Sequence, residues 1–332
     1  GVGDEIKINK LEFYMFDATT GVRDGDGVSD FGYFVQSSAS TVARFVVGAG
    51  DKRFVVAVNQ NLGNLAGLDY ADVVKVVNGL NLTNANSQTA PTEYAMSGET
   101  RTTVVAQTNQ TITIDVKRLV SKVRAPKLNT TNGGSVEFAT TKEEEYLQEL
   151  FGLDAVTNLK WEFNGYVVIN GVKQSYALPN NFNVTWVNPM PAATVRRTDS
   201  WFKTAYADGT GAVILTVYCG AASGDKFITK TSTSVVFVYE NVPTRTAGSN
   251  GSASTYAKDE VTALLIKGTF SCAEAPDAVR YWRVNLIKDD SWNVSRNTIY
   301  DFEIGRILTP RYETPTEAEE DDEISNPNKH VI

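Results

Sequence analysis

Histidine and cysteine are scarce in this sequence. Among 332 residues there is one histidine, His330, and there are two cysteines, Cys219 and Cys272. Nucleophilic Ser-His and Cys-His systems need an imidazole ring held beside the nucleophile, and a zinc site of four thiolates needs two more cysteines. The sequence therefore argues against both kinds of site. For the two cysteines, a pair of free thiols and a single disulfide bond both remain open.

Cofactor motifs and long apolar runs are also missing. The sequence contains no G-x-G-x-x-G, no G-x-x-x-x-G-K-[ST] and no H-E-x-x-H. Carboxylate pairs for glycoside chemistry stay open, because 39 Asp and Glu residues give many chance pairs. No stretch approaches the roughly 20 apolar residues of a membrane helix, and Gly1 begins no signal segment. We expect no enzymatic activity and no cofactor, and we expect any export signal to have been removed.

Positive charge is in deficit. Lys and Arg number 31 against 39 Asp and Glu, which gives a formal net charge of −8 at pH 7. Nucleic acids select surfaces rich in Lys and Arg, so this balance argues against a nucleic-acid partner. With 42% hydrophobic and 21% charged residues, the composition is that of an ordinary globular protein. The length is sufficient for two domains.

What the sequence does contain is alternation of apolar and polar residues at the period of a β-strand. The clearest case is 281–304, where two alternating arms, 281–286 and 299–304, flank a polar stretch and predict a hairpin. Two helices are predicted, at 69–79 and, after a capping box, at 141–151. Many strands with few helices indicate an all-β fold of antiparallel sandwiches. Further strands are predicted at 6–16, 43–47, 53–58, 102–106, 111–116, 159–169, 174–178, 183–187, 212–219, 234–239 and 262–270.

An acidic loop follows the first predicted strand. Asp24, Asp26 and Asp30 are spaced in a manner that suits the oxygen ligands of calcium. However, counting from Asp24, the sixth residue is Ser29, where a calcium loop needs glycine, and the twelfth is Val35, where it needs a bidentate Glu. The three aspartates are therefore only a weak metal candidate. A solvated Gly/Asp turn is the favoured interpretation.

Several motifs together resemble the FimA/Mfa-type (type V) fimbrial subunits of Bacteroidales. The Tyr-Trp-Arg-Val-Asn run from Tyr281 and the Arg-Asn-x-x-Tyr-x-Phe-x-Ile run from Arg296 are similar to the family's penultimate hairpin. The basic run 116–124 resembles the strand that passes from the family's first domain into its second. Further matches extend the resemblance over most of the chain, at 48–51, 69–79, 94–98, 238–243 and 262–268.

The resemblance implies two tandem transthyretin-like β-sandwich domains with one or two short helices. The first domain, 1–121, would carry a groove that accepts a strand. The second domain, 122–332, would end in an acidic extended tail at 309–332, because a run of like charges repels itself.

For function, the resemblance implies a structural subunit of an extracellular, cell-surface fimbria, most like a major shaft subunit of a short fimbria. Such subunits are exported via the outer membrane as lipoprotein precursors and lose an N-terminal strand to a protease. They polymerise by donor-strand exchange, in which a neighbour's strand fills the vacated groove, and the fimbria supports adhesion and biofilm formation.

The implied partners are other copies of the chain, accessory fimbrial subunits, and host or bacterial surface proteins. A membrane would be contacted only through the lipid anchor of the precursor. The implied interface residues lie at both ends of the sequence: Gly1, Val2, Gly3, Lys329, His330, Val331 and Ile332.

A second interpretation is a fimbrial tip or accessory adhesin, or a surface β-sandwich lipoprotein that binds glycan or protein. Five tryptophans could line such a binding surface. Trp161 and Trp282 fall within strand alternation and are expected in the core, whereas Trp201 and Trp292 lie in loop-like sequence and stay open. Exposed aromatic side chains would favour this interpretation, and exposed sheet edges would favour the fimbrial subunit.

Overall fold

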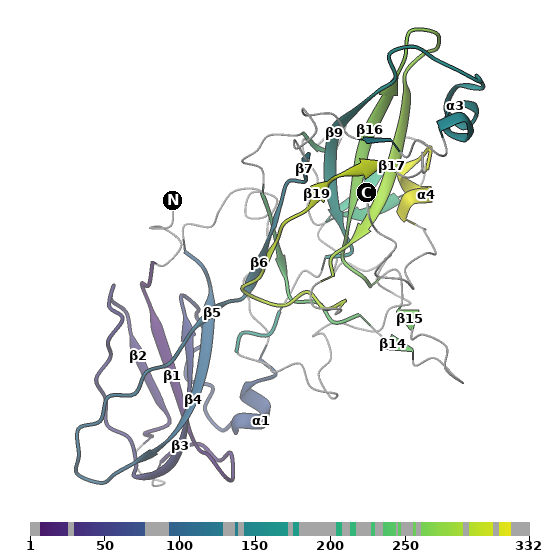
Figure 1. The fold of residues 1–332 in the computed structure, drawn as a ribbon. Coiled ribbons are helices and arrows are strands. Elements are labelled where there is room, and N and C mark those ends of the chain that lie inside the picture. Colours follow the sequence, from purple (N-terminus) through teal and green to yellow (C-terminus); the bar gives the residue numbers. More distant parts are fainter. Residues whose placement is uncertain are drawn as a thin grey trace. The chain divides into compact units, whose positions relative to one another are not determined.

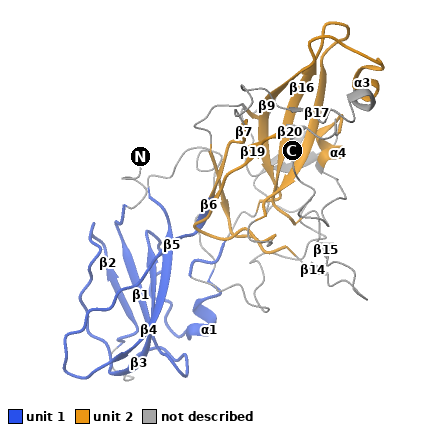
Figure 2. Cartoon of the chain, viewed as in Figure 1, with its two compact units in different colours: residues 1–81, 90–121, 174–190 blue, residues 82–89, 122–173, 191–332 orange. Residues whose placement is uncertain are grey.

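The computed structural model of the chain is built mainly of β-strands (Figure 1). It divides into two compact units, unit 1 with residues 1–81, 90–121 and 174–190, and unit 2 with residues 82–89, 122–173 and 191–332 (Figure 2). The prediction of an all-β fold is confirmed. The residues that the structure describes are 7–25, 30–76, 93–128, 137–138, 143–171, 175–178, 204–207, 213–216, 227–229, 235–243, 245–246, 255–256, 260–287, 292–307 and 312–319.

The sheet of unit 1 has five antiparallel strands: β1 (Leu11–Asp17), β2 (Tyr33–Gln36), β3 (Gly50–Val58), β4 (Met96–Val104) and β5 (Lys117–Arg118). They lie in the order β2-β1-β3-β4-β5. The register places Phe34, Phe13, Val56 and Gly98 side by side across the first four strands of that order. Because side chains alternate between faces, this row lies on one face and Tyr14 lies on the other.

A short helix covers the face of the sheet that carries Tyr14. The helix α1 (Tyr70–Val73) begins after Asp69, whose side chain accepts a hydrogen bond from the backbone N–H of Asp72. Val73 is fully buried in the same core cluster as Tyr14. The helix starts where the sequence predicted and ends early, in a run of valines whose branched side chains disfavour the helical state.

Residues 175–178 also pack on this face of unit 1. Ala177 and Leu178 are fully buried in one cluster with Tyr14, and the backbone N–H of Ala177 donates to the carbonyl oxygen of Val76 (2.9 Å). The sequence had placed these residues in the second domain. Their apolar side chains mark them as buried, but nothing in the local pattern shows which core receives them.

Unit 2 is a sandwich of two main sheets. The larger has the order β10-β11-β9-β16-β17, with β12 beside β9, and the smaller has the order β13-β6-β18. Phe163, Leu264 and Trp282 of the larger sheet share one buried cluster with Val123 and Tyr300 of the smaller. The strands are β6 (Val120–Arg124), β9 (Lys160–Ile169), β10 (Thr204–Ala207), β11 (Val213–Thr216), β12 (Ile228–Thr229), β13 (Val235–Tyr239), β16 (Ala263–Ser271), β17 (Ala278–Asn285) and β18 (Ile299–Tyr300).

The two arms of the predicted hairpin at 281–304 lie in different sheets. The first arm is part of β17, which pairs with β16. The second forms β18 and β19 (Glu303–Ile304), which pair in parallel with β6 and with β7 (Lys127–Leu128). The hairpin prediction is therefore wrong, although both arms are strands. Alternation identifies the buried face of a strand and does not identify its partner.

The remaining described elements are short. The helix α3 (Glu143–Phe151) confirms the helix predicted at 141–151. The strands β8 (Glu137–Phe138) and β20 (Arg306–Ile307) form a parallel pair, and β14 (Arg245–Thr246) and β15 (Thr255–Tyr256) form an antiparallel one. Across the described ranges, no helix is long and apolar enough to cross a membrane.

The first part of the predicted acidic tail forms a capped helix. Thr314 precedes α4 (Pro315–Glu319), and its hydroxyl accepts a hydrogen bond from the backbone N–H of Glu317 (3.2 Å). The Glu317 carboxylate in turn accepts one from the backbone N–H of Thr314 (3.0 Å). This reciprocal pair is a capping box, and Pro315 suits the first position of a helix.

The capped helix is docked on unit 2. Ala318 is fully buried in a cluster with Val167 and Leu265 on the outer face of the larger sheet. Just before the helix, Tyr312 exchanges two backbone hydrogen bonds with Tyr281 of β17 (2.9 and 3.2 Å). The prediction of an extended tail at 309–332 is therefore wrong for residues 312–319. Residues 320–332 lie outside the part that the structure describes.

Candidate strand-accepting surface

All seven interface residues predicted from the sequence, 1–3 and 329–332, lie outside the described ranges. Asp26 of the weak metal candidate and Cys219 lie outside them too. Cys272 is described as a half-buried free thiol. The expected contacts at the chain ends therefore stay predictions.

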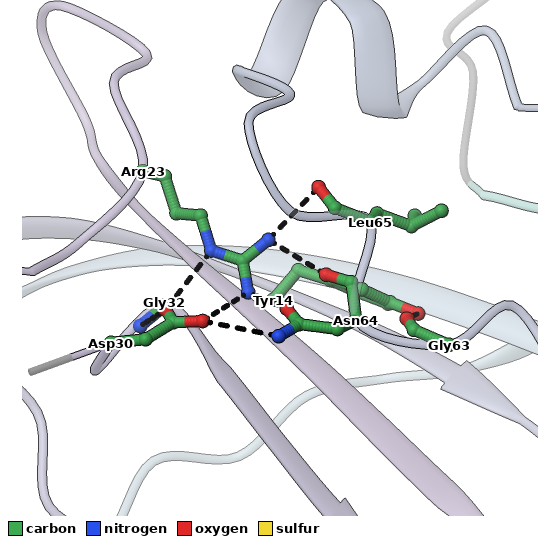
Figure 3. A network of polar contacts seen from close by, with 7 residues as sticks. All are labelled: Tyr14, Arg23, Asp30, Gly32, Gly63, Asn64 and Leu65. Atoms are coloured by element: carbon green, nitrogen blue, oxygen red, sulfur yellow. Dashed lines mark hydrogen bonds and ion pairs between the residues drawn. The ribbon is translucent and has the colours of Figure 1, made fainter.

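Asp24 and Asp30 each bind a different cationic side chain. Lys52 Nζ lies 2.5 Å from Asp24 Oδ1, and the backbone N–H of Gly48 donates to Asp24 Oδ2 (2.9 Å). Arg23 donates from Nε and Nη2 to the two oxygens of Asp30 (3.0 and 2.9 Å; Figure 3). The two carboxylates thus serve separate ion pairs. Among the residues that the structure describes, no group of three or more His, Cys, Asp or Glu could hold a metal ion.

Arg23 also ties this turn to the loop after β3 (Figure 3). Its Nη1 donates to the carbonyl oxygens of Asn64 (2.7 Å) and Leu65 (3.0 Å). Burial alone would raise the pKa of the Asp30 carboxyl, but hydrogen bonds from Arg23 and from Gly32, together with the guanidinium charge, lower that pKa below its usual range. The guanidinium therefore joins two loops and holds Asp30 ionised.

Glu12 and Tyr14 of β1 hold the same loop from the sheet. The fully buried carboxylate of Glu12 accepts hydrogen bonds from the backbone N–H groups of Leu62 (2.9 Å) and Gly63 (3.1 Å) and from Lys10 Nζ (2.9 Å). The Tyr14 hydroxyl donates to the carbonyl oxygen of Gly63 (2.7 Å). Burial, and then the charge of Glu12, raise the pKa of Tyr14. Glu12 and Tyr14 thus bind the backbone of the loop after β3 and hold this loop against the sheet.

The opposite face of the sheet meets the extended segment 43–47. Its side chains alternate in burial, with Phe45 half-buried and Arg44 exposed. The ring of Phe45 lies 5.0 Å from that of Phe13 and 4.9 Å from that of Phe34. Within the described ranges, the backbone of residues 43–47 makes no hydrogen bond. The strand predicted here therefore has the alternation of a strand and lacks a partner.

A second extended segment, 111–116, lies on the same face. Ile114 is half-buried and Asp115 is exposed, in the same alternating pattern. A Cβ atom added to Gly98 would lie 2.1 Å from the carbonyl oxygen of Asp115 and 3.1 Å from Ile114 Cγ2, so only glycine leaves room for the segment. The backbone of 111–116 likewise makes no hydrogen bond to any described residue. The strand predicted at 111–116 therefore also has no backbone partner among the described residues.

We refer to the segments 43–47 and 111–116, together with the sheet face that they flank, as the strand-accepting surface. Backbone N–H and C=O groups in folded proteins are almost always paired, and a free edge is a template for another strand. Large apolar side chains are exposed on or beside the surface: Val42 (64%), Val46 (76%) and Val105 (54%). The surface can therefore bind an extended segment through backbone hydrogen bonds.

Residues 2–146, which include both segments, match the family model described as major fimbrial subunit protein (FimA). This stretch is similar to the FimA family over somewhat less than half of the chain. The resemblance seen in the sequence motifs is confirmed. A search of curated proteins gives no match.

Solved structures of other proteins are similar to this chain. A candidate cell adhesion protein from Parabacteroides distasonis is 14% identical, covers 92% of this chain and 89% of its own, and has a TM-score of 0.51. A second such protein from the same organism is 13% identical, with coverages of 93% and 84% and a TM-score of 0.45. A fimbrial assembly protein, also from Parabacteroides distasonis, is 12% identical, with coverages of 90% and 84% and a TM-score of 0.39. At these identities the first match shows a shared fold.

The described tryptophans lie in cores of unit 2. Trp282 and Trp292 are buried, and the half-buried Trp161 packs edge-on against Trp282 at 5.8 Å. Core positions for Trp161 and Trp282 are as predicted, and Trp292, which the sequence left open, is buried beside Val261. Trp201 lies outside the described ranges. None of the three described tryptophans forms an exposed platform.

Sequence reasoning found the alternation in the segments of the strand-accepting surface and missed their unpaired state. Pairing depends on residues far away along the chain, so no local signal reports it. The buried Lys52–Asp24 pair was missed for the same reason. Gly98, which admits the second segment, lies in the stretch 94–98 that carries part of the family resemblance, but that motif does not show which segment packs against it.

Proposed function

We propose that the chain is a structural subunit of a cell-surface fimbria, and that unit 1 receives a strand from a neighbouring subunit at the strand-accepting surface. The proposal includes the finer steps that the family resemblance implies. These are export as a lipoprotein precursor, removal of an N-terminal strand, polymerisation by donor-strand exchange, and a role in adhesion and biofilm formation. Residues 1–3 and 329–332 are retained as proposed subunit contacts.

The observation that carries the proposal is the pair of unbonded extended segments on one apolar face. A strand added beside them would satisfy backbone groups that make no hydrogen bond to the described residues of unit 1. Its alternate side chains would meet the face that carries Phe13 and Val56, as in other complexes formed by strand addition. The FimA family match over residues 2–146 supports the same role.

The proposal can be tested through the backbone alone, because proline removes an N–H donor. Val46→Pro and Val47→Pro remove neighbouring donors that make no hydrogen bond within the described subunit. Successive N–H groups of a strand point to opposite edges, so we expect one of the two variants to block assembly and the other to retain it. Thr41→Pro, just outside the segment, is the matched control.

Assembly is measured by electron microscopy of cells that express each variant, and folding by circular dichroism of the purified subunit. If fimbriae form equally well with all three prolines, the strand-accepting surface is misplaced. If cells with the unchanged chain carry no fimbriae containing it, the proposed function itself is wrong.

A further inference from the structure

Arg44 and Asp115 carry opposite charges on the two segments of the strand-accepting surface. Both side chains are exposed, and neither forms an ion pair with any residue in the described ranges. Each is adjacent to a half-buried residue, Phe45 or Ile114, so alternation turns both charges away from the sheet. Lys117, two residues after Asp115 and just beyond the segment 111–116, is an exposed cation on the same side of the chain.

Both charges lie beside the same row of the sheet, which runs through Phe13 and Gly98. Phe45, next to Arg44, packs on Phe13. The carbonyl oxygen of Asp115 lies against Gly98. Phe13 and Gly98 are on strands that are two spacings apart, which corresponds to about 10 Å. Phe45 also packs on Phe34 of β2, so the two charged residues are separated across the surface by about two to three strand spacings.

A strand placed between the segments would fix that separation. When three strands are hydrogen-bonded side by side, the outer two lie about 10 Å apart. From ordinary bond lengths, an extended arginine reaches roughly 7 Å from its Cα and an aspartate roughly 3.5 Å. The guanidinium of Arg44 and the carboxylate of Asp115 can therefore meet above the backbone of the middle strand.

We propose that Arg44 and Asp115 close an ion pair across the strand that unit 1 receives, and that this pair slows the release of the strand. The inference rests on the proposed function, because it requires a strand between the two segments. The occupant is a strand of a neighbouring fimbrial subunit, with a small side chain facing outward beneath the pair. Arg44 and Asp115 are positioning residues, since they act on the strand by closing over it.

The test reverses the charges in the subunit and measures how fast subunits leave the fimbriae that the variants form. Arg44→Asp and Asp115→Arg each place like charges across the strand, and the double variant R44D/D115R restores the attraction in the opposite sense. We expect each single variant to speed subunit release in denaturant by roughly two- to fivefold, the range of an exposed ion pair. The double variant should return toward the unchanged rate, and high salt should shrink all of these differences.

The control is Arg101→Asp, an equal charge change at an exposed position of β4, which should leave the release rate unchanged. If a reversal variant fails to fold, the neutral pair Arg44→Gln and Asp115→Asn replaces it in a double-mutant cycle. A double variant that releases subunits as fast as the singles, or neutral variants whose effects simply add, would overturn the ion pair. If cells that express the unchanged chain carry no fimbriae containing it, the proposed function is overturned instead.

Discussion

Gly98 determines how closely the second segment of the strand-accepting surface approaches the sheet. A side chain at this position would overlap the carbonyl oxygen of Asp115, which is backbone and has little freedom to move. The neighbouring face residues Val56 and Met15 are almost fully buried. A single hydrogen atom in place of a side chain therefore allows 111–116 to lie on this face.

We expect Gly98→Ala to destabilise unit 1 by about 1–3 kcal/mol, the usual cost of overpacking. The displaced segment should also lose the ability to flank an incoming strand. Denaturant unfolding of the purified subunit measures the first effect, and electron microscopy of fimbriae measures the second. Gly305→Ala, at a glycine where an added Cβ meets nothing within 4 Å, should cost much less. Equal stabilities for the two variants would contradict this account.

The Lys52–Asp24 ion pair is the more buried of the two pairs in the acidic turn, with side-chain exposures of 9% and 7%. Lys52→Met leaves the Asp24 carboxylate without its cation, so we expect a loss of about 3 kcal/mol in the free energy of unfolding. The double variant D24L/K52M should recover much of that loss. Urea unfolding measures both. If added calcium restored the free energy of unfolding of the Lys52→Met variant, that result would support a metal site at Asp24, Asp26 and Asp30.

Two half-buried tyrosines, Tyr70 and Tyr33, are expected to make unit 1 sensitive to high pH. Burial, with a hydrogen bond to Glu99 and its charge, raises the pKa of Tyr70 to about 12, and burial beside Glu12 raises the pKa of Tyr33 to about 12. The ordinary tyrosine pKa is about 10. A pKa raised in the folded state gives stability that is complete below pH 10 and is lost as pH rises toward 12.

We therefore expect urea unfolding midpoints to fall steadily between about pH 10 and pH 12. In Tyr70→Phe the fall should be smaller, because one of the responsible hydroxyls is gone. Tyrosinate absorbance recorded beside circular dichroism tests whether ionisation and unfolding coincide. A Tyr70→Phe variant with the same pH slope as the unchanged chain would show that Tyr70 ionises freely.

At the scale of elements, the sequence predicted which stretches are strands better than it predicted their neighbours. The arms 281–286 and 299–304 are both strands, yet they belong to different sheets. The helix at 141–151 was found because a capping box and apolar spacing are local signals. The helix α4 has a capping box too, from Thr314 to Glu317, but the acidic run around it suggested an extended chain.

The cap of α4 gives a prediction about this element. Thr314→Ala removes the hydroxyl that accepts the Glu317 N–H and should cost about 1 kcal/mol. Because α4 buries Ala318 on the larger sheet, we expect its release to be seen as faster proteolysis near residues 312–319. Thr316→Ala, in the same helix, leaves the cap intact and serves as the control. Equal cleavage rates for the two variants would show that the cap does not hold the helix in place.

At the scale of the whole molecule, the two units differ in what they leave exposed. In unit 2 the two main sheets enclose a core, and the described tryptophans lie in cores of this unit. In unit 1 two extended segments make no backbone hydrogen bond to any described residue, and they lie on an otherwise buried face. If unit 1 accepts a strand from a neighbour there, as we propose, each contact joins a donor to an acceptor, which is the requirement for a head-to-tail filament.

Head-to-tail assembly makes a prediction about mixtures. A subunit that cannot accept a strand but can still donate one adds to a filament end and stops growth there. We therefore expect whichever of V46P and V47P blocks assembly to shorten fimbriae when mixed with the unchanged subunit. At one blocked subunit per ten, the mean length should fall to about ten subunits, because each blocked copy ends one open chain. Labelled variants should appear only at filament ends in electron micrographs. If they appear along the shaft, growth uses a different acceptor, and if lengths do not change, the blocked subunit has lost its donor as well.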